Sequence, residues 1–326
     1  KELYQDIKKN CKIKPGDVIL DIGANDGTFL KYFKKDRIIT IGCEPANNLK
    51  NELKKNCHYM INDFWHTKHM KKIPIKHQKL KVVSAIGMFY DLEDPSEFIK
   101  HAADALDDDG IFVAQLMCSH SMFKTNDLGN ICHEHLEYYS LKSIKFILDK
   151  VGFKIIDIEF NDINGGSFAL TVAKKNSTHN ENKKIVEWLL KKEEIFKYND
   201  LITHKNFYQE CLKQRKILIN LLKNLKNMKK TVLGYGASTK GNVILQFCNI
   251  DSNLIPYIGE VNKYKYNKYT PGSGIKIISE KELKNKKPDY LLVLPWHFKN
   301  FIIKKEQKFI KNGGKLIFPL PDIEII

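Results

Sequence analysis

The sequence predicts an α/β protein built from two doubly wound sheets, a larger one in the N-terminal half and a smaller one at the C-terminus. Three observations lead to this prediction. Short apolar runs alternate with amphipathic stretches over the first half of the chain, the alternation returns after residue 228, and each alternation begins with an apolar run that ends in a glycine-rich turn. Strands and helices that alternate over short connections form parallel sheets with helices on both faces.

The N-terminal alternation sets out the first sheet. The predicted strands are the apolar runs 17–23, 38–45, 58–64, 80–88 and 110–117. The predicted helices are the amphipathic stretches 27–36, 47–55, 94–106 and 140–152, the last of which closes at Gly152. The runs 154–162 and 165–175 are then expected to pair as a hairpin at one edge of the sheet.

A change of composition near Asn176 marks the end of this part of the chain. Charged amphipathic helices follow, and a second alternation begins at residue 229. Its expected strands are 229–237, 254–261, 288–296 and 315–326, and its expected helices are 239–248 and 297–314. We therefore predict a first α/β domain over 1–176, a helical connector over 177–228 and a second α/β domain over 229–326.

The net charge of +16, from 54 basic and 38 acidic residues, favours an anionic ligand. The lysines are spread along the predicted helix faces, and the sequence has neither a zinc-finger pattern nor an aromatic-rich RNA motif. A phosphorylated small molecule is therefore a better expectation than nucleic acid.

The seven cysteines occur singly, without a Cys-x-x-Cys pair, so the sequence favours neither a disulfide framework nor a zinc ribbon. No apolar run approaches the ~20 residues that span a bilayer, and the opening residues do not form a signal peptide. We expect a cytoplasmic protein without a membrane partner, as a monomer or a weak homo-oligomer.

The turn after the first predicted strand, "VILDIGANDGTFL", is the most specific local signal. Its glycines allow a tight turn close to a ligand, and the following helix start exposes N–H groups. This turn resembles the first motif of class I S-adenosylmethionine-dependent methyltransferases. The resemblance implies a Rossmann-like methyltransferase domain over 1–176 and makes Asp21, Gly23, Ala24, Asn25 and Gly27 cofactor-binding residues.

The ends of the next three predicted strands support the same cofactor. Glu44 ends the second strand, where a carboxylate can accept hydrogen bonds from both ribose hydroxyls, and the third strand ends beside the expected adenine position. All these positions lie at the carboxyl edge of one parallel sheet, where such folds bind ligands. The further cofactor-binding residues expected here are Asn62, Asp63, Phe64 and Gly87.

The stretch "GNICHEHLEYYS", residues 129–140, concentrates titratable groups. A zinc site needs three or four ligands, and His133 and His135 have no partner pair at ligand spacing, so we predict no metal. A structural histidine and a proton-transfer residue both remain open from the residues themselves. Periodicity does not choose between His133 and His135.

This stretch resembles the "HEHLxYYS" motif of sugar C-methyltransferases of the deoxysugar pathways. Those enzymes combine the motif with a Gly-Gly-Ser hairpin, a "GYGAxxKG" turn, a "PGxxI" loop and an "LPWxF" strand end, and this chain carries similar stretches at 164–167, 234–241, 271–275 and 294–298. The resemblance implies methyl transfer to a carbon next to the ketone of a nucleotide-activated sugar, with His135 as the base, assisted by Glu134 and Asp91.

The same resemblance makes 229–326 a smaller Rossmann-like domain that binds the nucleotide-diphosphate sugar. The "GYGASTKG" turn, with its glycines and lysine, also suits phosphate binding on its own chemistry. An NAD site is the alternative, with Glu260 as its candidate acidic residue. The substrate-binding residues that the resemblance implies are Asn164, Gly165, Gly166, Ser167, Tyr235, Ala237, Ser238, Lys240, Asn242, Trp296 and His297.

The sequence departs from this family in three places. Family members commonly have an N-terminal module rich in Cys-x-x-Cys pairs, a tyrosine where this chain has Cys132, and a histidine where it has Asp91. A thiol does not replace a phenol as a hydrogen-bond donor of the same reach. Two alternatives therefore stay open, an O-methyltransferase that acts on a sugar hydroxyl and a non-catalytic homologue that binds a nucleotide sugar.

Overall fold

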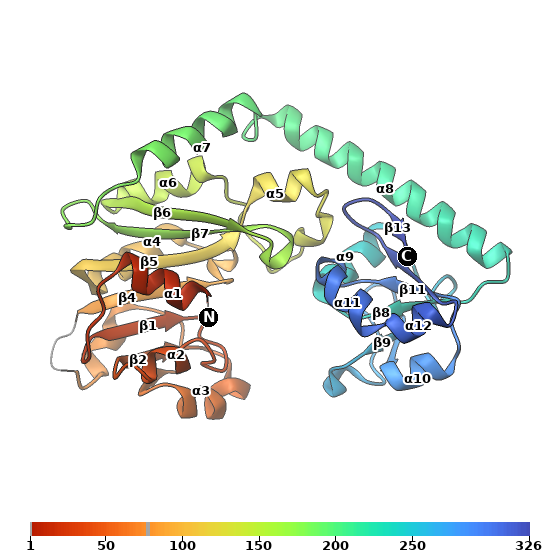
Figure 1. Cartoon of the computed structure of the whole chain (residues 1–326), viewed down its shortest axis with the longest axis horizontal. Coiled ribbons are helices and arrows are strands. Elements are labelled where there is room, and N and C mark those ends of the chain that lie inside the picture. Colours follow the sequence, from red (N-terminus) through yellow and green to blue (C-terminus); the bar gives the residue numbers. More distant parts are fainter. Residues whose placement is uncertain (1, 76–78) are drawn as a thin grey trace. The chain divides into compact units, whose positions relative to one another are not determined.

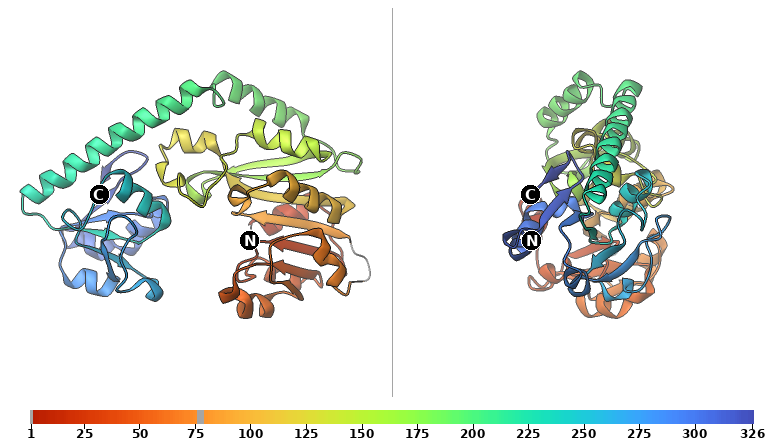
Figure 2. Two further views of the ribbon diagram at one scale, coloured as in Figure 1. Left: turned by 180° about the vertical axis from the view of Figure 1, so that it is seen from behind. Right: turned by 90° about the vertical axis from the view of Figure 1, so that its right-hand side faces the viewer.

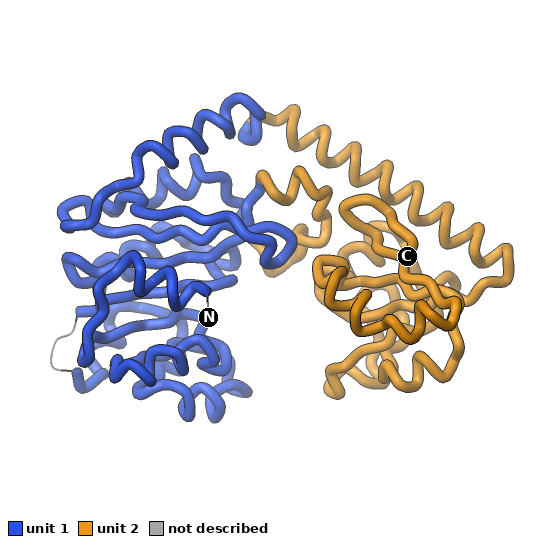
Figure 3. Tube along the Cα trace, in the orientation of Figure 1, with its two compact units in different colours: residues 1–119, 136–199 blue, residues 120–135, 200–326 orange. Residues whose placement is uncertain are grey.

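The computed structural model describes residues 2–75 and 79–326, which form two compact units (Figures 1 and 3). Unit 1 comprises residues 1–119 and 136–199, and unit 2 comprises residues 120–135 and 200–326. Each unit is built on its own sheet. The predicted fold class, two Rossmann-like α/β parts, is confirmed.

Unit 1 contains a seven-stranded sheet in the order β3-β2-β1-β4-β5-β7-β6. Strands β1 to β5 run parallel, because helices or 3₁₀ turns cross over between them. The strands are β1 (Val18–Ile22), β2 (Ile39–Cys43), β3 (Tyr59–Ile61), β4 (Leu80–Ile86), β5 (Leu106–Met117), β6 (Phe153–Asn161) and β7 (Ser167–Lys174).

Helices cover both faces of this sheet. Alternate residues of β1 face opposite ways, so Ile19 packs in one core and Leu20 in the other. One core contains Phe33, and the other contains Ile99. The first face is covered by α1 (Glu2–Asn10), α2 (Lys31–Lys34) and α3 (Lys50–Asn56), and the second by α4 (Pro95–Ala105), α6 (Leu141–Lys150) and α7 (Lys183–Ile195).

The predicted hairpin is confirmed as β6 and β7, which pair antiparallel. Strand β7 also pairs antiparallel with β5, so β6 forms the edge of the sheet. The turn between β6 and β7 places Asn164 at φ 55° and Gly166 at φ 131°. Glycine favours such positive φ values, which explains the Gly-Gly pair at this turn.

Unit 2 contains a six-stranded sheet in the order β10-β9-β8-β11-β12-β13, and its strands are parallel except for β13. The strands are β8 (Val232–Tyr235), β9 (Tyr257–Glu260), β10 (Lys276–Ser279), β11 (Tyr290–Val293), β12 (Lys315–Phe318) and β13 (Glu324–Ile325). The order changes direction at β8, with β9 on one side and β11 on the other. Ligands bind at such a switch point in open α/β sheets.

The helices of unit 2 pack around one apolar core with these strands. The helices are α5 (Ser119–Lys124, in this unit from His120 on), α8 (Leu201–Asn227), α9 (Thr239–Phe247), α10 (Glu280–Asn285), α11 (Lys299–Lys305) and α12 (Gln307–Lys311). Helix α8 is one continuous helix in the further views of Figure 2. It buries Phe207, Cys211, Leu218 and Leu222 on one face, at a helical spacing.

The units divide the chain at different places from the predicted segments. The expected connector 177–228 is shared, because α7 belongs to unit 1 and α8 to unit 2. Residues 120–135, expected within the first domain, belong to unit 2. Apolar burial explains this, since Met122 and Leu128 are part of the unit 2 core and the Phe123 ring lies 5.4 Å from the Phe207 ring.

No helix among the described residues 2–75 and 79–326 is long and apolar enough to cross a membrane.

The close contact between Gly129 and Trp296 provides a test of this packing. A methyl group added at Gly129 would lie 2.3 Å from Cη2 and 2.8 Å from Cζ2 of Trp296, in a site that buries both residues. Gly129→Ala should therefore lower the free energy of unfolding by ~1–3 kcal/mol, the usual cost of overpacking. Urea denaturation measures it. Ser252→Thr, which adds a methyl at an exposed turn of the same unit, is the control and should change stability by less than ~0.5 kcal/mol.

Candidate active site

The glycine-rich loop after β1 turns back on the neighbouring strand β2. The N–H groups of Gly23 and Ala24 both donate to the Cys43 carbonyl, at 2.9 and 3.1 Å, and Asn25 adopts a left-handed φ of 51°. Gly27 also has a positive φ, and an added Cβ would lie 2.8 Å from the Asn56 Cβ atom. The glycine is therefore required for both its conformation and its close approach to α3.

Asp21 is the buried carboxylate of this loop. It is 3% exposed, and its Oδ1 accepts a hydrogen bond of 2.7 Å from the Ser84 hydroxyl of β4. Burial raises the pKa of Asp21 to about 7, because desolvation penalises the charged form more than the Ser84 bond favours it. A cationic ligand beside this group would favour its charged form.

Glu44, just beyond the end of β2, connects this strand end to the glycine-rich loop after β1. Its Oε2 accepts from the Asn25 N–H at 3.0 Å, and its Oε1 accepts from the Ala46 N–H at 3.0 Å. A carboxylate has about four acceptor positions, so both oxygens keep capacity for ligand hydroxyls. The predicted ribose-binding carboxylate therefore also holds the glycine-rich loop in place.

The remaining predicted cofactor residues lie at the ends of β3 and β4. The Asn62 amide donates to the Glu44 carbonyl at 3.0 Å, so it positions the β2 end. Asp63 accepts from the Phe64 N–H, and the Phe64 ring is 77% exposed. Gly87 has a φ of 69°, and an added Cβ would meet only the Tyr90 hydroxyl, at 3.7 Å. The Phe64 face and the space at Gly87 are thus accessible to a ligand.

His135 belongs to the segment that packs in unit 2. Its Nδ1 lies 2.7 Å from the Asn130 carbonyl, which accepts only a proton-bearing nitrogen, so Nδ1–H donates and Nε2 is the basic nitrogen. Burial lowers the pKa of His135, and the nearby Lys240 lowers it further, against the Asn130 bond that raises it. The imidazole is thus neutral near pH 7.

A buried ion pair lies close to this imidazole and was missed by the sequence analysis. The Lys240 ammonium donates to Asp127 Oδ2 at 3.0 Å, and the exposed fractions of the two side chains are 12% and 1%. Asn130 donates to the same oxygen at 2.8 Å. The pKa of Asp127 is raised overall, because burial raises it more than the charge of Lys240 lowers it. No motif marked Asp127 or Asn130, and the lysine has a carboxylate partner that the phosphate-binding prediction did not include.

The neighbouring His133 and the two residues predicted to assist His135 differ in exposure and location. His133 is 88% exposed at its side chain, with Nε2 3.8 Å from Glu134 Oε1, and Glu134 is 52% exposed. Asp91 is exposed and belongs to unit 1, at the end of the 3₁₀ turn Phe89–Asp91. His135 is therefore the better shielded of the two histidines.

The hairpin residues predicted to bind substrate form the turn before β7. Asn164, Gly165 and Gly166 have positive φ values of 55°, 87° and 131°. Ser167 is buried, and its hydroxyl donates to the Ile163 carbonyl at 2.8 Å. The Ser167 hydroxyl therefore closes the turn, together with the N–H groups of Gly165 and Gly166, which donate to the Asp162 and Ile163 carbonyls.

The predicted substrate residues of unit 2 have several roles. The Tyr235 hydroxyl donates to the buried Glu306 at 2.9 Å, and Ser238 caps α9 by accepting from the Gly241 N–H at 3.0 Å. Trp296 is 6% exposed and packs against Gly129. These three side chains thus make hydrogen bonds or packing contacts within unit 2 itself.

Asn242 and His297 carry buried polar atoms that point to a ligand or water. Asn242 Oδ1 and His297 Nδ1 have no hydrogen-bond partner within residues 2–75 and 79–326. Burial lowers the pKa of His297 to about 4, so the ring is neutral at physiological pH. Buried polar atoms are normally satisfied, so both are good candidates for ligand contacts.

Comparison with known proteins accounts for nearly the whole chain. A family model described as "Methyltransferase domain" matches residues 1–158, and one described as "C-methyltransferase C-terminal domain" matches residues 162–321. C-methyltransferase NovU of Streptomyces niveus is 28% identical over 311 residues, which cover 95% of this chain and 74% of NovU. The chain belongs to the S-adenosylmethionine-dependent C-methyltransferases.

Solved methyltransferase structures align with about half of this C-methyltransferase. A S-adenosylmethionine-dependent methyltransferase from Archaeoglobus fulgidus is 17% identical, with a TM-score of 0.42, over 53% of this chain and 90% of its own. The putative methyltransferase in complex with its Trm112 activator from Haloferax volcanii is 12% identical, with a TM-score of 0.43, over 52% and 88%.

The cofactor of this C-methyltransferase is S-adenosylmethionine. The residues of unit 1 suit this molecule, because Asp21 offers a buried carboxylate to a cation and Glu44 keeps acceptor capacity for hydroxyls. Within residues 2–75 and 79–326, no three His, Cys, Asp or Glu side chains group as metal ligands.

Removal of Lys240 tests the buried ion pair of the enzyme. Lys240→Met leaves Asp127 as an unpaired buried carboxylate, so the free energy of unfolding should fall by ~3–5 kcal/mol in urea denaturation. The double variant Asp127→Leu, Lys240→Met removes both charges and should recover part of the loss. Equal stability of wild type and Lys240→Met would contradict this account.

Proposed function

We propose that this C-methyltransferase methylates the carbon next to the ketone of a nucleotide-activated keto sugar. The observation that supports this is the geometry of His135, whose Nδ1–H donates to the Asn130 carbonyl and directs the basic character to Nε2. A neutral, half-buried imidazole is suited to removing a proton near pH 7.

C-methylation at such a position requires a nucleophilic carbon. His135 Nε2 takes the α-proton, and the electrons of the C–H bond pass into the enolate of the neighbouring ketone. S-adenosylmethionine, when bound, supplies an electrophilic methyl group on a sulfonium. The enolate carbon would form the new C–C bond as the methyl–sulfur bond breaks and its electron pair goes to sulfur, which would leave S-adenosylhomocysteine, so the protein mainly aligns substrate and cofactor.

The assisting residues are proposed from their chemistry. Glu134 positions the sugar or orients the imidazole, and Asp91, a shorter group than the histidine of the resembling family, contacts the sugar. The hairpin turn at 164–167 and the unpaired polar atoms of Asn242 and His297 add substrate contacts. The Asp127–Lys240 pair supports the position of Asn130, and through it the tautomer of His135.

The cofactor contact proposed for Glu44 leads to a binding test. Glu44→Gln removes the charge that strengthens hydrogen bonds to ribose hydroxyls, so cofactor affinity should fall by ~1.5–3 kcal/mol. Isothermal titration calorimetry with S-adenosylhomocysteine measures this. An unchanged affinity would contradict the assignment of Glu44.

The proposed base leads to a kinetic test. His135→Asn keeps a hydrogen-bonding side chain but removes the basic nitrogen, so the methyl transfer rate should fall ~10²–10⁴-fold. His133→Asn, the same substitution at an exposed position, is the matched control and should change the rate much less. Urea denaturation of both variants reports whether they are folded.

Proton exchange separates the proposed enolate from methylation at oxygen. In deuterium oxide with S-adenosylhomocysteine, the wild type should exchange the α-proton of a nucleotide-activated 4-keto sugar, and His135→Asn should not. NMR of the product should place the new methyl on carbon. A methyl on oxygen, or full activity of His135→Asn, would disprove the proposed reaction.

A further inference from the structure

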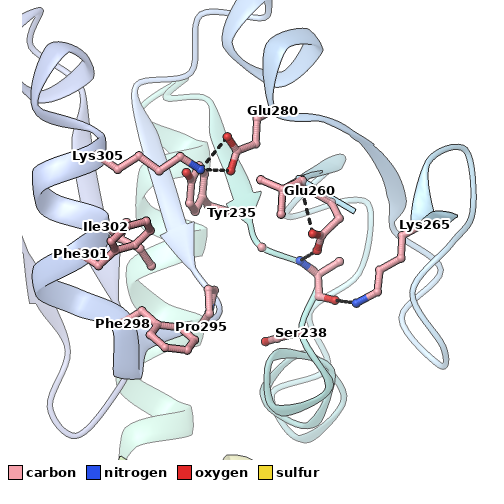
Figure 4. Close-up of a pocket in the computed structure, with 13 residues that line it drawn as sticks. Tyr235, Ser238, Glu260, Lys265, Glu280, Pro295, Phe298, Phe301, Ile302 and Lys305 are labelled. Carbon is pink, nitrogen blue, oxygen red and sulfur yellow. Dashed lines mark hydrogen bonds and ion pairs between the residues drawn. The ribbon is translucent and has the colours of Figure 1, made fainter. Parts of the chain in front are cut away.

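The cavity of unit 2 belongs to the substrate site expected for that unit. It has a volume of about 570 Å³ and lies at the carboxyl ends of β8, β9 and β11. In Figure 4, Ser238 and Glu260 lie on one side of it and Phe298 lies on the other. A second cavity lies in unit 1, and none of the residues that line it was predicted to bind cofactor or substrate.

The cavity of unit 1 lies at the edge of the sheet where the amino ends of the strands meet. It has a volume of about 460 Å³, and its lining comes from the end of α1, the turn before β1, the first parts of β4 and β5, and the segment after β7. Strand β1 runs parallel to β4, and β4 to β5, so their amino ends share this edge. The five residues of β1, roughly 15 Å at the rise of a strand, separate the cavity from the cofactor loop.

A tight turn fixes the part of the cavity that precedes β1. The sequence Lys14-Pro15-Gly16-Asp17 has proline and glycine at the central positions that a type II turn favours, and Gly16 has a φ of 90°. The Asp17 N–H donates to the Lys14 carbonyl at 3.0 Å, and the Lys14 N–H donates to Asp17 Oδ2 at 2.7 Å. Lys14 and Asp17 therefore reach the cavity from a fixed backbone.

Asp109 fixes the opposite part of the cavity. Its carbonyl accepts from the Lys81 ammonium at 2.9 Å and from His179 Nε2–H at 3.1 Å. Its carboxylate Oδ1 accepts from the Thr178 N–H at 2.8 Å. The Asp109 carboxylate, like that of Asp17, is thus held by a backbone N–H group and not by a lysine side chain.

Four lysines line the cavity without a carboxylate partner. Within residues 2–75 and 79–326, no ion pair includes Lys9, Lys12, Lys14 or Lys81. The neighbouring Lys8, by contrast, pairs with Asp36 at 2.8 Å and is not part of the lining. Four lysines and two aspartates give the lining an excess of two positive charges, before His179 is counted. Such a concave, positively charged site attracts a phosphate dianion.

The two carboxylates add a second kind of contact. Asp17 and Asp109 are each held through one oxygen, so the other oxygen keeps capacity to accept a hydroxyl. These carboxylates repel a bare inorganic anion, whereas a phosphate ester that carries hydroxyl groups can donate to them. The lining therefore favours a molecule with both groups.

We propose that this cavity binds a small phosphorylated molecule with free hydroxyl groups, its phosphate held by the four lysines and its hydroxyls by Asp17 and Asp109. The cavity volume falls in the range of small-molecule sites. Sugar phosphates and nucleoside phosphates share this chemistry. The site belongs to unit 1, away from the cofactor loop, and its occupation does not depend on the proposed methylation reaction.

Calorimetry at low ionic strength, with the cofactor site saturated by S-adenosylhomocysteine, tests the inference. The probes are glucose 1-phosphate, AMP and pyrophosphate, with glucose as the uncharged control. Glucose 1-phosphate or AMP should bind, glucose should not, and added sodium chloride should weaken the binding several-fold by screening the lysines. The stronger of the two esters shows whether the ligand is a sugar phosphate or a nucleotide. If neither ester binds, or if S-adenosylhomocysteine displaces the bound ester, the proposal is overturned.

Matched charge variants place the ligand in the cavity. The double variant Lys12→Gln, Lys14→Gln should weaken binding of the ester about tenfold or more, because two charge-assisted contacts are lost. Lys142→Gln, Lys191→Gln is the control, since it removes the same charge from exposed positions of α6 and α7 outside the cavity and should leave the affinity nearly unchanged. Equal effects of the two double variants would show binding to the net charge alone and would overturn the site.

The contact between Asp17 and a hydroxyl has its own test. Asp17→Asn keeps an oxygen for the Lys14 N–H but removes the charge that strengthens a bond to a hydroxyl. Pyrophosphate should bind as well or better, because a repulsive charge is gone, while the ester that binds the wild type should bind more weakly. The ratio of the two affinities should therefore shift several-fold toward pyrophosphate. A merely structural role of Asp17 would change both affinities alike, and a ratio equal to that of the wild type would overturn this assignment.

Discussion

A carboxylate at the end of the second strand holds the ligand loop of each sheet. In unit 1, the Glu44 carboxylate accepts a hydrogen bond from the Asn25 N–H. In unit 2, the Glu260 carboxylate accepts one from the Ala237 N–H. A charge-assisted bond of this kind fixes a glycine-rich loop that has little conformational preference of its own. The loop can therefore present its backbone to a ligand, and the same carboxylate keeps acceptor capacity for a hydroxyl.

The segment 120–135 shows how a buried ion pair determines a chemical property. Asp127 and Lys240 are shielded from water, and breaking such a pair leaves an uncompensated charge. The pair holds Asn130 through its amide, and the Asn130 carbonyl holds His135 Nδ1–H. The protonation site of the imidazole thus follows from contacts to α9, a helix more than 100 positions further along the chain.

The main elements of both sheets were predictable from the sequence, and the exceptions have local causes. Strand β10 was not predicted, although Ile277 and Ile278 between polar neighbours are a short apolar signal. The expected strand 315–326 is two antiparallel strands, β12 and β13. The partner of Lys240 was not predicted, because a sequence shows the lysine of a glycine-rich turn but not Asp127, the carboxylate that pairs with it.

The sequence by itself determined the fold class, the family and the positions of the two glycine-rich loops with their carboxylates. These features are local, and a parallel sheet brings the carboxyl ends of its strands to one edge whatever the rest of the chain does. The tertiary structure decided that residues 120–135 join unit 2, that His135 donates through Nδ1, and that a cavity lies between Glu260 and Phe298. Those outcomes depend on burial and on contacts between distant residues, which no local pattern encodes.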